Sequence, residues 1–176
     1  MNSAKNIAIN EVAIWWYHDQ KRYEKISIVA QQMLHSLNFS EKELASASKN
    51  IQNAFYYYDQ AEQFPQRKKK SLDEMEKYHE KVMIALQINK KLAKLYRLWW
   101  EKFMEKKYLL VAYYLFQYHL IGLTGLTKIL SPILWFIMVL AGLLGHNKKN
   151  KKIATILLTK YWQIIKFFKI KGFIIY

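Results

Sequence analysis

Residues 108–145 read YLLVAYYLFQYHLIGLTGLTKILSPILWFIMVLAGLLG, a stretch with one charged side chain, Lys128. It lies within a longer region, residues 106–176, that contains eleven lysines and no acidic residue. A soluble domain usually mixes both signs of charge on its surface. A bilayer instead excludes charge from its core, and its anionic cytoplasmic leaflet attracts lysine. The sequence therefore predicts that the C-terminal third of the chain is bound to a membrane.

The apolar stretch is too long for one straight crossing. As a single helix it would extend about 57 Å, whereas the hydrocarbon core of a bilayer is roughly 30 Å thick. In a hairpin, one helix would enter near Tyr108 and a second, beginning at Pro132, would return to Gly145. In a single span, residues 121–144 would cross once and Pro132 would kink the helix. The residues predicted for the hairpin turn are Gly122, Gly125, Lys128, Ser131 and Pro132.

Lysines on both sides of the stretch favour the hairpin. By the positive-inside rule both flanks prefer the cytoplasmic side, which a hairpin satisfies and a single span does not. A hairpin that dips into the bilayer without crossing it is a further alternative, because the second arm is short for a full crossing. A buried hairpin in a soluble bundle is the remaining alternative, and it explains the apolar residues but not the missing acids. The flanking lysines are Lys102, Lys106, Lys107, Lys148, Lys149, Lys151 and Lys152.

The first 105 residues have the composition of a helical domain. They carry 17 basic and 13 acidic residues, a net charge of +4, and residues 1–64 contain neither glycine nor proline. Because glycine and proline interrupt regular structure, their absence favours long helices. Apolar residues at alternating spacings of three and four, from Ile9 to Leu37, predict one helix over residues 5–37, with Asp19 as the single polar side chain on that face.

Two capping patterns place the next helices. Ser40 begins a Ser-x-x-Glu pattern, which predicts a helix over residues 41–64 that ends before a proline. Ser71 begins a second such pattern, which predicts a helix over residues 72–107. Nothing in the sequence stops this helix before Tyr108, so we expect it to continue directly into the apolar stretch.

Together these patterns predict an all-α fold in three parts. Residues 1–107 are expected to form a long-helix, coiled-coil-like three-helix bundle on the cytoplasmic side of the membrane. Residues 108–145 are expected to form a membrane-embedded helical hairpin. Residues 146–176 are expected to form a lysine-rich juxtamembrane segment and a basic amphipathic C-terminal helix, also on the cytoplasmic side.

The C-terminal helix separates apolar from basic residues. On a helical projection Tyr161, Ile165 and Phe168 lie on one side, whereas Lys166 and Lys169 lie on the other. Such a helix is expected in the membrane interface, with its lysines toward anionic head groups. A helix that packs back on the bundle is the alternative. The residues predicted to contact lipid head groups are Lys148, Lys149, Lys151, Lys152, Lys166 and Lys169.

No motif in the sequence indicates catalysis or a cofactor. The chain has no cysteine, and it contains no phosphate-binding glycine loop and no Gly-x-Ser-x-Gly nucleophile motif. Glu76 and His79 have the Glu-x-x-His spacing of di-metal helical bundles, but no second copy exists, so no metal site is predicted. Three aromatic groups are each expected to contribute one side chain to the core: Trp15-Trp16-Tyr17, Tyr56-Tyr57-Tyr58 and Trp99-Trp100.

These observations predict a non-enzymatic, membrane-anchored helical-bundle protein that tethers or presents a cytosolic interaction surface at a membrane with anionic lipids. The N-terminal bundle is expected to bind a protein partner. The alternatives are a membrane-disrupting protein of holin-like or pore-forming type and a bacterial effector directed to host membranes. Binding of nucleic acid is disfavoured, because the N-terminal region is nearly balanced in charge. The sequence leaves open whether copies of the chain form a homo-oligomer.

Overall fold

The computed structural model describes residues 3–168, which form eight α-helices, three short 3-10 helices and no β-strand. The all-α fold expected from the sequence is confirmed. The 3-10 helices are η1 (Pro65–Arg67), η2 (Gly125–Leu130) and η3 (Lys148–Asn150). The α-helices are α1 (Ser3–Asp19), α2 (Tyr23–His35), α3 (Glu41–Gln63), α4 (Lys68–Ala85), α5 (Lys91–Met104), α6 (Tyr108–Gly122), α7 (Ser131–Gly145) and α8 (Lys151–Phe167).

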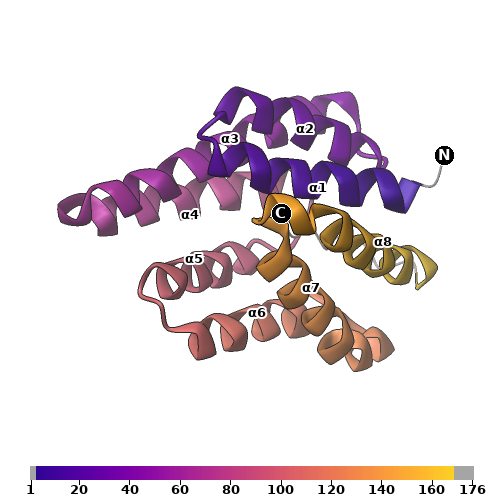
Figure 1. Ribbon diagram of the computed structural model, residues 1–176. Helices are drawn as coiled ribbons and strands as arrows, with labels where there is room; N and C mark the ends of the chain where they lie inside the picture. The colour runs from indigo at the N-terminus through magenta and orange to yellow at the C-terminus, as the bar shows by residue number, and fades with distance from the viewer. Residues whose placement is uncertain (1–2, 169–176) are drawn as a thin grey trace.

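Consecutive helices pack against one another along the chain, and the last helix returns to the first (Figure 1). Helices α3 and α4 form the longest hairpin, while α1 lies between α2 and α8. Because α8 packs on α1, the N-terminal helices and the apolar C-terminal helices share one hydrophobic core.

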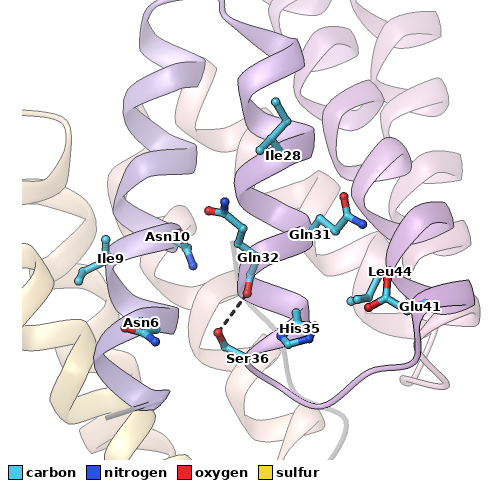
Figure 2. A pocket seen from close by; sticks show the side chains of 10 residues that line it. All are labelled: Asn6, Ile9, Asn10, Ile28, Gln31, Gln32, His35, Ser36, Glu41 and Leu44. Carbon is cyan, nitrogen blue, oxygen red and sulfur yellow. Dashed lines mark hydrogen bonds between the residues drawn. The ribbon is translucent and has the colours of Figure 1, made fainter. Parts of the chain in front are cut away.

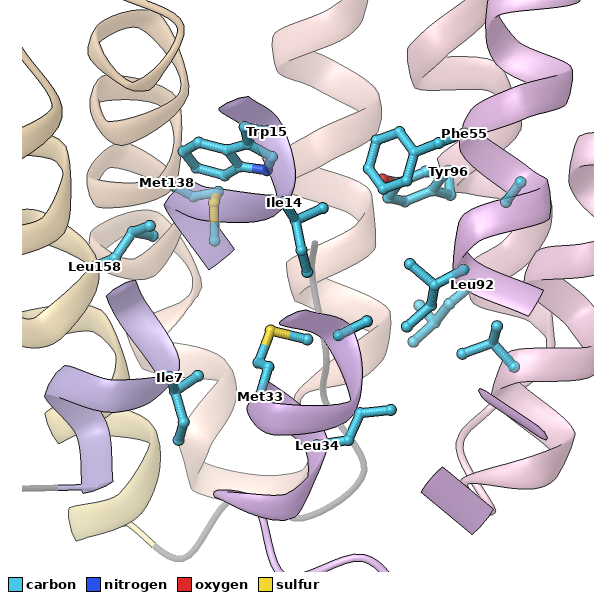
Figure 3. Close-up of a cluster of buried hydrophobic side chains, with 14 of the residues drawn as sticks. Ile7, Ile14, Trp15, Met33, Leu34, Phe55, Leu92, Tyr96, Met138 and Leu158 are labelled. Carbon is cyan, nitrogen blue, oxygen red and sulfur yellow. The ribbon is translucent and has the colours of Figure 1, made fainter. Parts of the chain in front are cut away.

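That core is built from the buried faces of all eight α-helices. Burial of a large apolar side chain stabilises a fold by about 1.5–3 kcal/mol. Each of the three aromatic groups contributes one such side chain, Trp15, Tyr58 or Trp100, as predicted. Figure 3 shows part of the core, in which side chains from six helices meet: Ile7, Ile14, Trp15, Met33, Leu34, Phe55, Leu92, Tyr96, Met138 and Leu158.

The single helix expected over residues 5–37 is two helices, α1 and α2, separated by a sharp turn. Lys21 has a φ of 58°, in the left-handed region. Its ammonium group donates to the buried carboxylate of Asp59 on α3, which also accepts from His18 Nε2 at 3.0 Å and from Tyr23 Oη at 2.5 Å. These bonds fix the turn against α3. Burial alone would raise the pKa of Asp59, but the three donors hold it below its ordinary value.

The helix predicted over residues 41–64 agrees closely with α3. Ser40 takes the N-cap position, and its backbone N–H donates to Glu43 Oε2 at 2.7 Å, so the predicted capping box is present. The second capping pattern does not act as a cap. Helix α4 begins at Lys68, directly after η1, and Ser71 lies inside its first turn.

The helix predicted over residues 72–107 is interrupted twice, between α4 and α5 and again between α5 and α6. Gln87 and Lys106 adopt the left-handed conformation at these breaks, with φ of 55° and 56°. The residue after each one donates its N–H to the carbonyl five positions earlier, Ile88 to Met83 at 2.7 Å and Lys107 to Lys102 at 3.0 Å. This is the Schellman pattern, which ends a helix and satisfies its last carbonyls.

The break expected between Gly122 and Pro132 is present. Helix α6 ends at Gly122, η2 follows, and α7 begins at Ser131 with Pro132 in its first turn. Leu130, rather than Ser131, takes the N-cap position of α7. Helices α6 and α7 contact each other, and Trp135 Nε1 donates to the Ala112 carbonyl at 3.0 Å.

Candidate functional site

Helices α6 and α7 and the η2 segment between them carry an exposed apolar surface. Twenty large apolar side chains are exposed among the described residues, and ten of them lie in this segment. Leu109 is 89% exposed and Leu126 is 87% exposed. Large contiguous apolar patches on proteins often mark contact sites for a membrane or another protein. The ten residues, called the apolar surface below, are Tyr108, Leu109, Leu110, Tyr113, Ile121, Leu126, Ile129, Ile133, Phe136 and Leu143.

One helical segment in the described part of the chain, Gly125–Gly145, is long and apolar enough to cross a membrane. It has 21 residues, within the range of about 17–25 that spans a hydrocarbon core. Only 28% of its most apolar window is buried. A core helix of a soluble bundle would be mostly buried, so the packing of this segment differs from that of a core helix.

The five residues predicted for the turn lie together in the connection from α6 to α7. Gly122 ends α6, and Gly125, with a φ of 55°, starts η2. Lys128 is exposed within η2, so the single charge of the apolar stretch lies at the tip that joins the two helices. Ser131 and Pro132 begin α7, and the Ser131 side chain is buried.

The lysines that follow α7 do not all face solvent. Lys149 and Lys152 are exposed, whereas the ammonium of Lys151 lies 3.2 Å from the ring centroid of Trp16 on α1, a cation–π contact. Lys148 begins η3. The structure thus leaves Lys149 and Lys152 open to an anionic head group, while Lys151 also fastens α8 to α1.

Helix α8 packs on the bundle, and this differs from the free interfacial helix expected from its pattern. Tyr161 and Ile165, expected to face lipid, are buried in the core. Lys166 Nζ donates to Ser3 Oγ at 2.5 Å and to the Ser36 carbonyl at 3.3 Å, so this lysine bonds within the protein. The predicted contact at Lys169 lies outside the described residues. The exposed side of α8 instead carries Ile153, Ile156 and Phe167.

A cluster of lysines surrounds one carboxylate at the turn between α5 and α6. Glu105 accepts from Lys102 Nζ at 2.9 Å, and Lys107 Nζ and Lys68 Nζ lie 3.0 and 3.5 Å from its oxygens. Hydrogen bonds from Lys102 and Lys107 lower the pKa of Glu105 to about 2. Glu101 also acts on Lys102, so the three ammonium groups of this turn face two carboxylates and leave it basic at neutral pH.

A second surface feature is a groove of about 650 Å³ formed by α1, α2 and the start of α3, with both polar and apolar walls (Figure 2). Its walls carry the side-chain amides of Asn6, Asn10, Gln31 and Gln32, with His35 at one end. These groups can donate and accept hydrogen bonds, as a polar protein partner requires. The groove belongs to the N-terminal half of the chain, whereas the apolar surface belongs to α6 and α7.

The Glu-x-x-His pair does not converge on a common point. The His79 ring packs in the core against Tyr96, with ring centroids 4.0 Å apart. Glu76 instead pairs with Arg97, whose Nε lies 3.4 Å from its carboxylate. Within residues 3–168 no group of three or more His, Asp or Glu side chains is arranged to hold a metal ion.

Two buried acidic residues, Asp59 and Glu11, have structural roles that no sequence pattern predicts. Asp59 anchors the turn between α1 and α2, and Glu11 accepts from Trp162 Nε1 at 2.7 Å where α1 meets α8. The only sequence signal for Glu11 is that it interrupts an apolar run.

No protein-family model matches this chain, and no curated protein or solved structure shows significant similarity to it.

Proposed function

We propose that this chain is a membrane-anchored helical-bundle protein, in which α6, η2 and α7 enter the bilayer and the remaining helices present an interaction surface. The observation that carries the proposal is the apolar surface, ten large side chains with one neighbouring charge, Lys128. Burying such side chains in hydrocarbon is favourable by about 25 cal/mol per Å² of apolar area.

The basic residues fit the same arrangement. The lysine cluster around Glu105 precedes α6, and Lys149 and Lys152 follow α7. Each lysine near an anionic surface contributes about 1 kcal/mol. If α6 and α7 enter as a hairpin, both basic flanks lie on one side of the membrane, which is the cytoplasmic side by the positive-inside rule.

The groove of α1, α2 and α3 is the surface we assign to a protein partner. Its walls combine four side-chain amides with Ile9, Ile28 and Leu44, so it suits a partner that offers both hydrogen-bonding groups and apolar contacts. In this arrangement the apolar surface fixes the protein on the membrane and the groove binds the partner, without catalytic turnover.

Membrane flotation and carbonate extraction of the full chain test the proposal. Phe136, 56% exposed in the middle of the candidate span, is replaced by Asp, and Ile84, 59% exposed on α4, is replaced by Asp as the matched control. A charged residue at the centre of a bilayer costs about 2.5–3.5 kcal/mol, so Phe136→Asp should lower the equilibrium constant for membrane binding about 100-fold. Ile84→Asp should leave it unchanged.

Two outcomes would contradict the proposal. Wild-type protein that stays soluble without detergent would show that the apolar surface is covered in another way. Equal membrane binding by both variants would show that α7 does not enter the bilayer. Leakage of dye from anionic vesicles at low protein concentration would assign the membrane-disrupting alternative instead.

A further inference from the structure

An apolar cavity of about 410 Å³ lies between α1, α5, α6 and α7. Its volume falls within the roughly 300–1,000 Å³ of small-molecule sites. The lining is mostly aromatic and aliphatic, and no carboxylate takes part in it. Figure 3 shows two of its walls, Trp15 and Met138, beside each other. The residues that define the cavity for the argument below are Trp15, Trp99, Trp100, Leu115, Met138 and Gly142.

Two glycines on α7 show that the cavity is open space rather than loose packing. A Cβ added at Gly145 would approach Trp15 Cε3 to 2.5 Å, so this glycine is needed for close packing of α7 on α1. A Cβ added at Gly142, one helical turn earlier and in the cavity wall, would meet no atom within 4 Å. The first glycine fits the indole of Trp15, while the second leaves room for a ligand.

One part of the cavity wall is next to a basic turn. Phe103 and Tyr108 line the cavity, and the turn between them contains Glu105 with the lysine cluster around it. An anionic group is therefore favoured beside Phe103 and Tyr108, because the ammonium groups of this turn outnumber its carboxylates.

We propose that this cavity binds a long-chain fatty acid, with its chain among Trp99, Trp100 and Met138 and its carboxylate near Lys102 and Lys107. The apolar lining matches a hydrocarbon chain, and the basic turn matches the carboxylate. This inference goes beyond anchoring. A chain that binds the fatty acid without staying in the membrane would support it while contradicting the proposed anchor.

Photo-crosslinking of the full chain in phosphatidylcholine nanodiscs with a diazirine-bearing palmitate tests the inference, with adducts mapped by mass spectrometry. We expect adducts on residues of the cavity wall, removed by excess palmitate. Gly142→Trp fills the cavity from a position where a side chain meets open space, and it should lower these adducts at least 10-fold. Gly142→Leu gives the same comparison with a smaller change in volume. Ile84→Trp, at an exposed position on α4 outside the cavity and the apolar surface, is the matched control that should have no effect.

A separate pair of substitutions tests the position of the fatty-acid carboxylate. Lys102→Gln with Lys107→Gln should reduce cavity adducts from the palmitate probe but not from the methyl ester of the same probe, which lacks the charge. The inference is overturned if adducts fall only on residues of the apolar surface other than Tyr108 and Leu143, which also line the cavity. It is also overturned if Gly142→Trp and wild type give equal adducts in the cavity wall. Equal loss of both probes in the lysine variant would overturn the placement of the carboxylate.

Discussion

Trp162 on α8 donates its indole N–H to the carboxyl of Glu11 on α1, 2.7 Å away and 151 positions earlier in the chain. Both side chains are fully buried. Glu11 Oε1 accepts no hydrogen bond from any described residue. Burial raises the pKa of Glu11 to about 8, and the bond from Trp162 offsets only part of that shift. The contact between α1 and α8 is thus held by a carboxyl group that is protonated at neutral pH.

Glu11→Gln should remove a loss of stability that wild type shows as the pH rises from about 4.5 to 8. Below pH 4.5 the carboxyl group is protonated in both the folded and the unfolded chain. Between about pH 4.5 and 8 the unfolded chain releases this proton and the folded chain keeps it, so the free energy of unfolding falls by about 1.4 kcal/mol per pH unit. The amide has no such slope.

Denaturant unfolding of Glu11→Gln and wild type in detergent, from pH 4 to 9, measures this slope. Glu24→Gln, at an exposed site on α2, is the control and should behave as wild type. A slope that survives in Glu11→Gln would show that another group causes it.

His79 should produce the opposite trend on the acid side. It is fully buried, and burial lowers its pKa to about 3. As the pH falls below about 6.5 the unfolded chain binds a proton at this residue while the folded chain does not, so stability is lost with decreasing pH. Relative to wild type, His79→Phe should lower the slope of the unfolding free energy against pH by about 1.4 kcal/mol per pH unit between pH 6.5 and 4, whatever its effect on stability at pH 7. Unfolding curves at four pH values measure this change. If the variant and wild type show the same dependence of the unfolding free energy on pH below 6.5, the lowered pKa of His79 is contradicted.

Glycine should stabilise the protein at the ends of α4 and α5, two helix ends that no sequence pattern predicts. Gln87 and Lys106 have positive φ, a conformation that a residue with a Cβ adopts at a cost and glycine adopts freely. Gln87→Gly and Lys106→Gly should each raise the free energy of unfolding by about 0.5–1 kcal/mol. Lys160→Gly, at an exposed position within α8, should lower it by about 1 kcal/mol.

The signs of these changes separate two structures. If residues 72–107 formed one continuous helix, all three substitutions would destabilise the protein by similar amounts. Thermal unfolding in detergent detects the difference directly.

Asp59→Asn should be strongly destabilising. The carboxylate is buried and bonds to His18, Lys21 and Tyr23, and removing its charge breaks a buried pair, at a cost of about 3–5 kcal/mol. Asp73→Asn is the matched control, because Asp73 pairs with Arg97 at the surface and should contribute less than about 1 kcal/mol. Equal effects in chemical denaturation would contradict the central role of Asp59.

The sequence predicts helix boundaries where it contains the residues that usually mark them. Ser40 with Glu43 located the start of α3, and Gly122 with Pro132 located the break between α6 and α7. Lys21, Gln87 and Lys106 end helices in the left-handed conformation without glycine. Their ends are set by tertiary contacts such as that of Lys21 with Asp59, so the apolar pattern runs through them unchanged.

The sequence also does not determine whether the apolar face of α8 contacts lipid or the protein core. An apolar face that contains Tyr161 and Ile165 suits a bilayer as well as a protein core, because both exclude water. Only the position of α1 decides between them, and this depends on long-range packing. Of the twenty exposed large apolar side chains among the described residues, fourteen lie within residues 106–168, in the part of the chain that has no acidic residue.

The contact between α1 and α8 also sets an order of events during synthesis. Translation at about 5–20 residues per second leaves roughly 8–30 s between the emergence of Glu11 and that of Trp162. Helix α1 can pack on α2 early in this interval, but its contact with α8 has to wait until Trp162 is made. Helix α7 ends at Gly145, 17 positions before Trp162, so the apolar hairpin is complete only about 1–3 s before the residue that joins α8 to α1.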